Sequence, residues 1–177
     1  MTPTEALSHF AETRPKNVAF IKDKEIWTYE RLATEVDRLA RGLIEHGVRK
    51  GERVALHMAN LPEFAIAYHA CFRVGAIAAP LNIRFKTAEL TPLLQRLRPA
   101  LYIGQAALYS QVASIDSSIL ASNNRFVVVD APSTTLGCSH GQDYLPRPMA
   151  SRSESLRTWM RLLCCSRPPE PPASRNS

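Results

Sequence analysis

The 177-residue sequence contains no long hydrophobic run, no signal-like start and, after Lys86, no lysine. Its apolar stretches, such as residues 76–81, are far shorter than the ~20 residues that a membrane-spanning helix needs. The first ten residues carry Glu5 and have neither the basic nor the apolar segment of a signal peptide. We therefore predict a cytoplasmic protein without a membrane span.

The chain also lacks the cysteine pattern of a metal site or a disulfide framework. Its cysteines are Cys71, Cys138, Cys164 and Cys165, and no two of them have C-x-x-C spacing. The neighbouring Cys164 and Cys165 would point in different directions on a regular backbone. Without an export signal, disulfides are not expected. We interpret all four cysteines as incidental.

Motifs that bind phosphate or activate a nucleophile are absent. The seven glycines form no G-x-G-x-x-G, no G-x-x-x-x-G-K-[ST] and no G-x-S-x-G pattern. Residues 133–137 read Ser-Thr-Thr-Leu-Gly, but a phosphate cradle needs several glycines and a lysine. We interpret this stretch as a plain loop.

The net charge of +6 is concentrated in the C-terminal part of the chain. Residues 146–177 contain six arginines and two glutamates, which leaves only +2 for residues 1–145. Trp159 is the sole aromatic residue of this tail, so it lacks the stacking platform of a single-strand binder. We predict no nucleic-acid partner.

Isolated polar residues in the body of the chain do not form a site pattern. His57 falls on a predicted strand and His69 on the helix after it, and we interpret both as structural residues because neither has a patterned partner. Arg84 and Glu89 follow Pro80 and are interpreted as a solvated charged face. We therefore predict no catalytic, cofactor-binding or metal-binding residue in this chain.

The first half of the body shows clear periodicity. Residues 4–13 predict a helix, and residues 18–21 and 26–28 predict a β-hairpin. A second helix is predicted with Thr28 as its N-cap and Gly47 as its C-terminal stop. Its apolar stripe consists of Leu32, Val36, Leu39, Ala40, Leu43 and Ile44.

The second half alternates strands and helices. Asn60 is predicted to cap a helix that ends at Gly75, with Glu63 in capping-box position. A further helix is predicted over residues 88–97, capped either by Thr87 or by Thr91 with Pro92 at its first position. The remaining elements are strands at 53–58, 76–79, 101–103 and 126–129 and a helix at 106–120. The strand at 76–79 is wholly apolar, so we expect it to be buried on both faces.

This alternation predicts an α/β fold, in which a partial, mostly parallel sheet is flanked by helices over residues 1–130. Residues 131–145 are predicted to be a polar loop. Residues 146–177 hold six of the 13 prolines and are predicted to be a disordered Arg/Pro/Ser-rich tail. We hypothesise that a frameshift or alternative splice between residues 136 and 152 produced this tail. Translating the other reading frames tests that idea.

Two stretches resemble core motifs of the adenylate-forming, AMP-binding superfamily. Residues 27–32, Trp-Thr-Tyr-Glu-Arg-Leu, are similar to its L-[TS]-Y-x-E-L motif, with Trp27 in place of Leu and Arg31 in place of Glu. Residues 72–82 resemble the second motif, a helix end followed by Gly, a buried strand and Pro. Residues 51–55 and 60–64 agree in order and spacing. The acyl-CoA synthetase branch fits best.

The resemblance implies a two-step reaction in which ATP and a carboxylic acid give an acyl-adenylate that CoA then captures. ATP, Mg²⁺ and CoA serve the intact family, and the residues that bind them lie downstream of both motifs. We therefore predict an N-terminal fragment of an AMP-dependent acyl-CoA synthetase that binds none of these and is inactive alone. The alternative is a non-catalytic module that pairs with a full-length synthetase or with itself. An enzyme of another class would need an activated nucleophile or a patterned group of metal ligands, and the sequence shows neither.

Overall fold

The computed structural model describes residues 2–121 and 124–128 of the chain. Its elements, in chain order, are α1 (Pro3–Thr13), β1 (Val18–Lys22), β2 (Glu25–Thr28), α2 (Tyr29–Glu45), β3 (Arg53–His57), α3 (Pro62–Val74), β4 (Ile77–Pro80), α4 (Thr87–Leu97), β5 (Leu101–Gln105), the 3₁₀ helix η1 (Ala106–Gln111) and β6 (Arg125–Val128). The predicted loop 131–145, which includes the stretch 133–137, and the tail 146–177 lie outside the described residues.

The N-terminal elements form as their sequence predicts. Thr2 caps α1, since its hydroxyl accepts from the Glu5 amide and the Glu5 carboxylate accepts from the Thr2 amide. Strands β1 and β2 pair as an antiparallel hairpin. Thr28 caps α2, because its hydroxyl accepts from the amide of Arg31 at 3.3 Å. Gly47 follows α2 with φ +80°, as expected of a left-handed stop.

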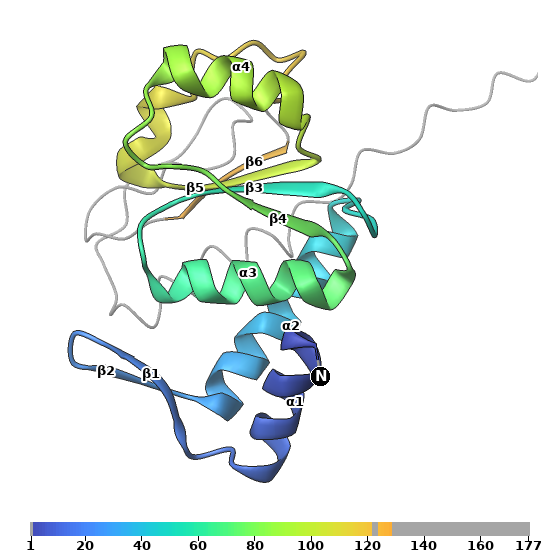
Figure 1. Cartoon of the computed structure of the whole chain (residues 1–177), viewed down its shortest axis with the longest axis vertical. Helices are drawn as coiled ribbons and strands as arrows, with labels where there is room; N and C mark the ends of the chain where they lie inside the picture. The colour runs from blue at the N-terminus through green and yellow to red at the C-terminus, as the bar shows by residue number, and fades with distance from the viewer. Residues whose placement is uncertain (1, 122–123, 129–177) are drawn as a thin grey trace, which may run out of the picture.

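A four-stranded parallel sheet in the order β4-β3-β5-β6 forms the centre of the fold. The chain leaves β3 toward β4 on one side and then returns to β5 on the other side. Because crossovers between parallel strands are right-handed, this reversal places α3 and α4 on opposite faces of the sheet (Figure 1). The predicted α/β class with a mostly parallel sheet is confirmed.

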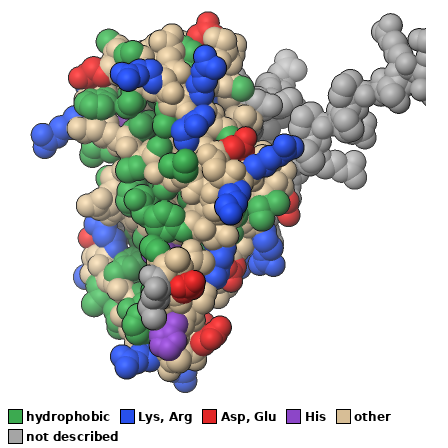
Figure 2. All heavy atoms as spheres, turned by 45° about the vertical axis from the view of Figure 1, so that its right-hand side comes forward, with side chains coloured by type: hydrophobic (Ala, Val, Ile, Leu, Met, Phe, Trp, Pro, Cys, Tyr) green, Lys and Arg blue, Asp and Glu red, His purple; other side chains and the backbone are tan. Residues whose placement is uncertain are grey.

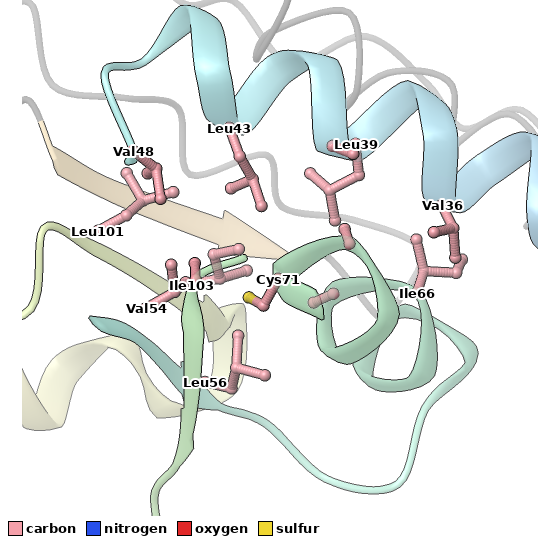
Figure 3. Close-up of a cluster of buried hydrophobic side chains, with 14 of the residues drawn as sticks. Val36, Leu39, Leu43, Val48, Val54, Leu56, Ile66, Cys71, Leu101 and Ile103 are labelled. Atoms are coloured by element: carbon pink, nitrogen blue, oxygen red, sulfur yellow. The ribbon is translucent and has the colours of Figure 1, made fainter. Parts of the chain in front are cut away.

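Two apolar layers enclose this sheet. The first lies between the sheet and helices α2 and α3, where Leu39, Leu43 and Ile66 meet Val54 and Ile103 (Figure 3). The second lies under α4 and is made by Ala55, Leu81, Leu90, Leu94, Tyr102, Val112, Ile115 and Leu120. Alternate residues of β3 and β5 point to opposite layers, as the two-residue period of a strand requires.

The start of α3 differs from the prediction. Leu61, not Asn60, is the N-cap, with an extended backbone at φ −102° and ψ 160° and no side-chain capping bond. Pro62 explains the shift, since proline suits the first helical position and holds the preceding residue extended. The helix therefore begins without the predicted capping box of Asn60 and Glu63, and Glu63 is only 6% exposed.

Strand β4 is an edge strand, so the expectation of burial on both faces is wrong. Ile77 is 52% exposed, and β3 is the one strand that pairs with β4 in the described part of the chain. The Ile77 amide donates to the carbonyl of Glu52, just before β3, and the Leu81 amide donates to the carbonyl of Leu56 in β3. The backbone nitrogen of Pro80, which precedes Leu81, therefore faces away from β3. Proline has no N–H to offer a further strand, and an outward position at a sheet edge is where it is tolerated.

Two helix predictions in the second half are also corrected. Helix α4 begins at Thr87, and the Glu89 carboxylate accepts from the Lys86 amide at 2.9 Å, so neither Thr87 nor Thr91 is the cap. The predicted helix over residues 106–120 is the short η1 followed by turns. There the amide of Ser118 bonds the Asp116 carboxylate at 2.6 Å, a local bond that competes with helix formation.

Surface hydrophobic side chains remain on the described part of the molecule. Figure 2 shows hydrophobic side chains between charged ones on one face. The most exposed large ones are Val18, Ile21, Ile26, Ile44 and Ile77. Among the described residues no helix has both the length and the apolar character needed to cross a membrane.

Candidate functional site

The carboxyl ends of β3 and β5 are the natural place to seek a site in this sheet. The strand order reverses between these two strands, and ligands of open α/β sheets bind where neighbouring crossovers diverge. His57 ends β3 directly beside Gly104 of β5. The Ala59 amide donates to the Gln105 side-chain oxygen at 3.0 Å, which ties the loop after β3 to the end of β5.

A buried polar pair lies at this edge. His57 Nδ1 and the Tyr102 hydroxyl are 2.9 Å apart, and both residues are fully buried. His57 Nε2 has no hydrogen-bond partner among the described residues. The two rings meet edge to face, with centroids 6.0 Å apart. A fully buried imidazole has no surface on which a substrate atom could lie, so this pair acts as a packed polar contact.

Burial also controls the charge states of this pair. It lowers the pKa of His57 because the imidazolium loses its hydration, while the backbone of Asn82 acts in the opposite direction. Burial raises the pKa of Tyr102 well above its ordinary value, Tyr109 adds to that effect, and Arg125 opposes it. Both groups are therefore neutral at pH 7.

Gly104 makes the His57–Tyr102 contact sterically feasible. A Cβ atom at this position would lie 2.3 Å from the Tyr102 hydroxyl oxygen and 2.5 Å from the ring. The Tyr102 ring therefore lies over Gly104 and reaches along the sheet toward β3. A side chain at position 104 would occupy the space that the ring needs.

Arg125 at the start of β6 is a second buried polar centre. Its guanidinium, in a residue 6% exposed, donates to the carbonyls of Leu120 at 2.9 Å, Val112 at 3.1 Å and Ile115 at 2.8 Å. A further bond of 3.3 Å reaches the carbonyl of Ala113. A regular helix over 106–120 would pair the Val112 and Ala113 carbonyls with amides four residues further on; here both accept from Arg125, and the Val112 carbonyl also accepts from the Ile115 amide at 3.1 Å.

The first family-like motif fastens the hairpin to α2. The Arg31 guanidinium lies 3.7 Å from the centre of the Trp27 ring and pairs with the Glu25 carboxylate at 2.6 Å. Phe20 stacks on Trp27 with ring centroids 5.6 Å apart. The two departures from the usual motif, Trp27 and Arg31, are thus in direct contact.

The second family-like motif joins α3 to the sheet. Gly75 caps α3 in the left-handed region with φ +72°, and its carbonyl accepts from the Gly51 amide at 2.8 Å. Arg73 pairs with Asp37 of α2 at 2.6 Å and donates to the Ser8 hydroxyl of α1 at 2.7 Å. Both motifs therefore have structural roles.

The other residues considered from sequence are not brought together. His69 lies on α3, where burial and then Arg73 lower its pKa. Burial raises the pKa of the Cys71 thiol to about 12, so this cysteine is not reactive at neutral pH. Arg84 lies in the loop before α4 and Glu89 in its first turn, both exposed.

Among the described residues, no three or more His, Cys, Asp or Glu side chains are grouped so that they could hold a metal ion. The contacts of Tyr102, Gly104 and Arg125 were not predicted from the sequence, because a Tyr-x-Gly stretch on a strand and an Arg at the start of a strand are common patterns.

Comparison with known proteins identifies the family. The model of the AMP-binding enzyme family matches residues 7–174. A crotonobetaine/carnitine–CoA ligase of Escherichia coli O1:K1 is 35% identical over 97 residues, which are 53% of this chain and 19% of that protein. The chain thus spans about a fifth of the length of the curated relatives it matches.

Solved structures agree in fold. An anthranilate CoA ligase in complex with anthranoyl-AMP superposes with a TM-score of 0.71 and 21% identity, over 89% of this chain and 27% of that one. A benzoate CoA ligase from Burkholderia xenovorans LB400 gives a TM-score of 0.65 and 21% identity, over 98% of this chain and 30% of that one. On the strength of the family match and of this shared fold, the chain belongs to the AMP-binding enzyme family, as its sequence resemblance predicts.

Proposed function

We propose that this chain provides the N-terminal scaffold of an AMP-forming acyl-CoA ligase and does not turn over substrate by itself. This proposal rests on the family match, and the structural roles of both motifs support it. Trp27 and Arg31 fasten a hairpin, and Gly75 and Arg73 join α3 to its neighbours. These side chains are engaged in packing the scaffold, which supports a structural role for both motifs.

The reaction proposed for the family has two balanced steps. A carboxylate oxygen attacks the α-phosphorus of ATP, which forms an acyl-adenylate and releases pyrophosphate. The CoA thiolate then attacks the acyl carbon and releases AMP. In this proposal the complete enzyme binds ATP, Mg²⁺ and CoA. The acyl substrate is a carboxylic acid, and the residues of this chain do not select its class.

Exchange of labelled pyrophosphate into ATP tests the first step directly. The purified 177-residue chain is assayed with a panel of acids chosen from the named relatives, including carnitine, crotonobetaine, benzoate and anthranilate. A homologous full-length ligase serves as the positive control. We expect no exchange above the blank for the chain alone, and acid-dependent exchange would overturn the proposed inactivity.

The alternative role is a non-catalytic module that associates with a full-length synthetase. The exposed apolar side chains Ile21 and Ile26, which face each other across the β1–β2 hairpin, support this alternative. Co-purification of a tagged chain with a full-length AMP-binding ligase from the same source tests it. A variant with both isoleucines changed to lysine is the control, and equal recovery of the ligase with both chains would contradict the idea.

A further inference from the structure

One side of α4, next to its buried face, carries a shallow hollow that the roles proposed above do not use. It is lined by Glu89, Pro92, Leu93, Arg96 and Leu97. These positions follow the i, i+3, i+4, i+7, i+8 pattern, so they form one stripe along the helix. The stripe lies beside the buried stripe of Leu90 and Leu94, which packs α4 on the sheet. Leu93 and Leu97 of this stripe are half-buried and also pack against that core cluster, while Glu89, Pro92 and Arg96 are exposed.

The charges of this stripe are arranged symmetrically. Glu89 lies in the first turn and Arg96 in the last turn of α4. Seven residues separate them, which corresponds to ~10.5 Å along the axis at ~1.5 Å per residue. Arg96 makes no hydrogen bond or ion pair with any described residue, while Glu89 uses Oε2 to accept from the Lys86 amide. Each side chain therefore has a charge available to a partner.

A two-fold axis passing between Pro92 and Leu93 makes this stripe complementary to itself. Rotation by half a turn sets a second α4 antiparallel to the first and places Glu89 opposite Arg96 of the second copy. The reverse pair forms on the other side of the axis, and Pro92 faces Leu93 between them. Antiparallel helices pack with axes ~8–10 Å apart, a distance that glutamate and arginine side chains span together.

We propose that two copies of this chain associate through an isologous α4–α4 contact with paired Glu89 and Arg96 side chains. A second copy is the occupant that the charge pattern fits, since a self-complementary patch is the requirement of an isologous dimer. The inference is independent of catalysis. An 11-residue helix is ~16 Å long, so the contact buries less than the ~1,200 Å² of a stable complex, and the dimer is weak.

Charge reversal in single variants and in their mixture tests the pairing. E89R sets two arginines opposite each other on both sides of the axis, and R96E sets two glutamates there, so each variant alone loses both attractions. A mixture of the two variants restores one attractive pair on each side of the axis. Sedimentation velocity over micromolar to millimolar concentrations should show association of the wild type, roughly tenfold weaker self-association of each variant, and recovery in the mixture.

A matched control and a second method keep the outcome unambiguous. E45R changes charge equally at an exposed position of α2 and should associate like the wild type. Because E89R also removes the bond to the Lys86 amide, helix content is compared by circular dichroism. A mixture no more associated than its components, or a wild type monomeric at every concentration, overturns the proposal.

Cysteine crosslinking replaces charge reversal if either variant fails to fold. In a chain whose Cys138, Cys164 and Cys165 are changed to serine, P92C places a thiol next to the two-fold axis. Copper–phenanthroline oxidation should then give a covalent dimer. Q95C, on another side of α4, should not, and equal crosslinking of both variants would exclude this interface.

Discussion

At the scale of single residues, one buried polar pair and one glycine decide the packing at the carboxyl edge of the sheet. His57 and Tyr102 come from different strands and share a 2.9 Å contact, while Gly104 leaves the space through which the tyrosine ring passes. Each of these residues depends on the other two. Replacing two of them together should therefore change the free energy of unfolding by an amount that differs from the sum of the two single changes.

The stability of the chain should fall as the pH drops below about 6.5. Burial lowers the pKa of His57 in the folded chain below the 6.5 of an unfolded histidine, so the unfolded state binds more protons in that range. The contribution of neutral His57 to the free energy of unfolding is complete above the pKa of histidine in the unfolded chain. It is lost progressively as the pH falls toward the pKa of His57 in the folded chain. Urea unfolding at pH values of about 8, 7, 6 and 5 measures it.

His69 is the internal control for this pH dependence, because burial also lowers its pKa. H57L should flatten the slope of unfolding free energy against pH more than H69Q does, since His57 is fully buried and His69 is only half-buried. An unchanged slope in H57L would show that His57 does not titrate as described.

Replacing Gly104 with alanine should destabilise the chain by about 2–3 kcal/mol, because the new Cβ would meet the Tyr102 ring at 2.5 Å. Y102V in the same chain removes the ring, and the G104A change should then cost about 1 kcal/mol or less. Urea unfolding of the wild type, both single variants and the double variant gives the coupling energy. Additive effects would contradict this steric explanation.

At the scale of elements, single arginines set the shape of two segments that hydrophobic periodicity describes incompletely. Arg125 donates hydrogen bonds to carbonyls of the irregular segment after β5. Arg31 connects α2 to the hairpin through its contacts with Trp27 and Glu25. In both cases the guanidinium offers several donors in one plane, which suits simultaneous contacts with groups from different turns.

Removal of the Arg125 guanidinium should cost about 3–5 kcal/mol. R125M keeps the length of the side chain but leaves the carbonyls of Val112, Ile115 and Leu120 buried without these donors. Hydrogen exchange should become faster in residues 106–120 and change less in α2, which packs on the other face of the sheet. Equal acceleration in both segments would indicate general loosening instead.

The contact of Trp27 with Arg31 should appear as a coupling of about 0.5–1 kcal/mol. W27L and R31E each restore a usual residue of the family motif, and each alone breaks the cation–ring contact. R31E also sets two carboxylates together at Glu25. A double-mutant cycle by urea unfolding should show W27L/R31E less destabilised than the sum of the single changes, whereas additivity would show that the two departures are unrelated.

At the scale of the whole molecule, the described residues form a small parallel sheet covered on both faces, with a hairpin that projects from its N-terminal helices (Figure 1). The outer face of that hairpin exposes Ile21 by 62% and Ile26 by 55%. A two-stranded sheet with an uncovered apolar face gains little stability of its own. This face therefore contributes little to the core.

Changing both hairpin isoleucines to lysine should lower binding of a hydrophobic dye and non-specific aggregation while leaving the unfolding free energy within about 0.5 kcal/mol. I66K is the contrasting variant, because Ile66 is fully buried, and it should unfold the chain. Dye fluorescence and urea unfolding of the three chains measure this. A large loss of stability in the hairpin variant would show that the isoleucines belong to the core.

Residues close together in the chain were enough to predict the α/β class, the hairpin, α2 with its Thr28 cap, and the family, because periodicity, caps and short motifs are local. Contacts between distant segments determine instead that β4 is an edge and that residues 106–120 are irregular. Strand order and the carbonyl partners of Arg125 become visible only once the chain has folded. The His57–Tyr102 contact joins residues 45 positions apart, so no local pattern could have predicted it.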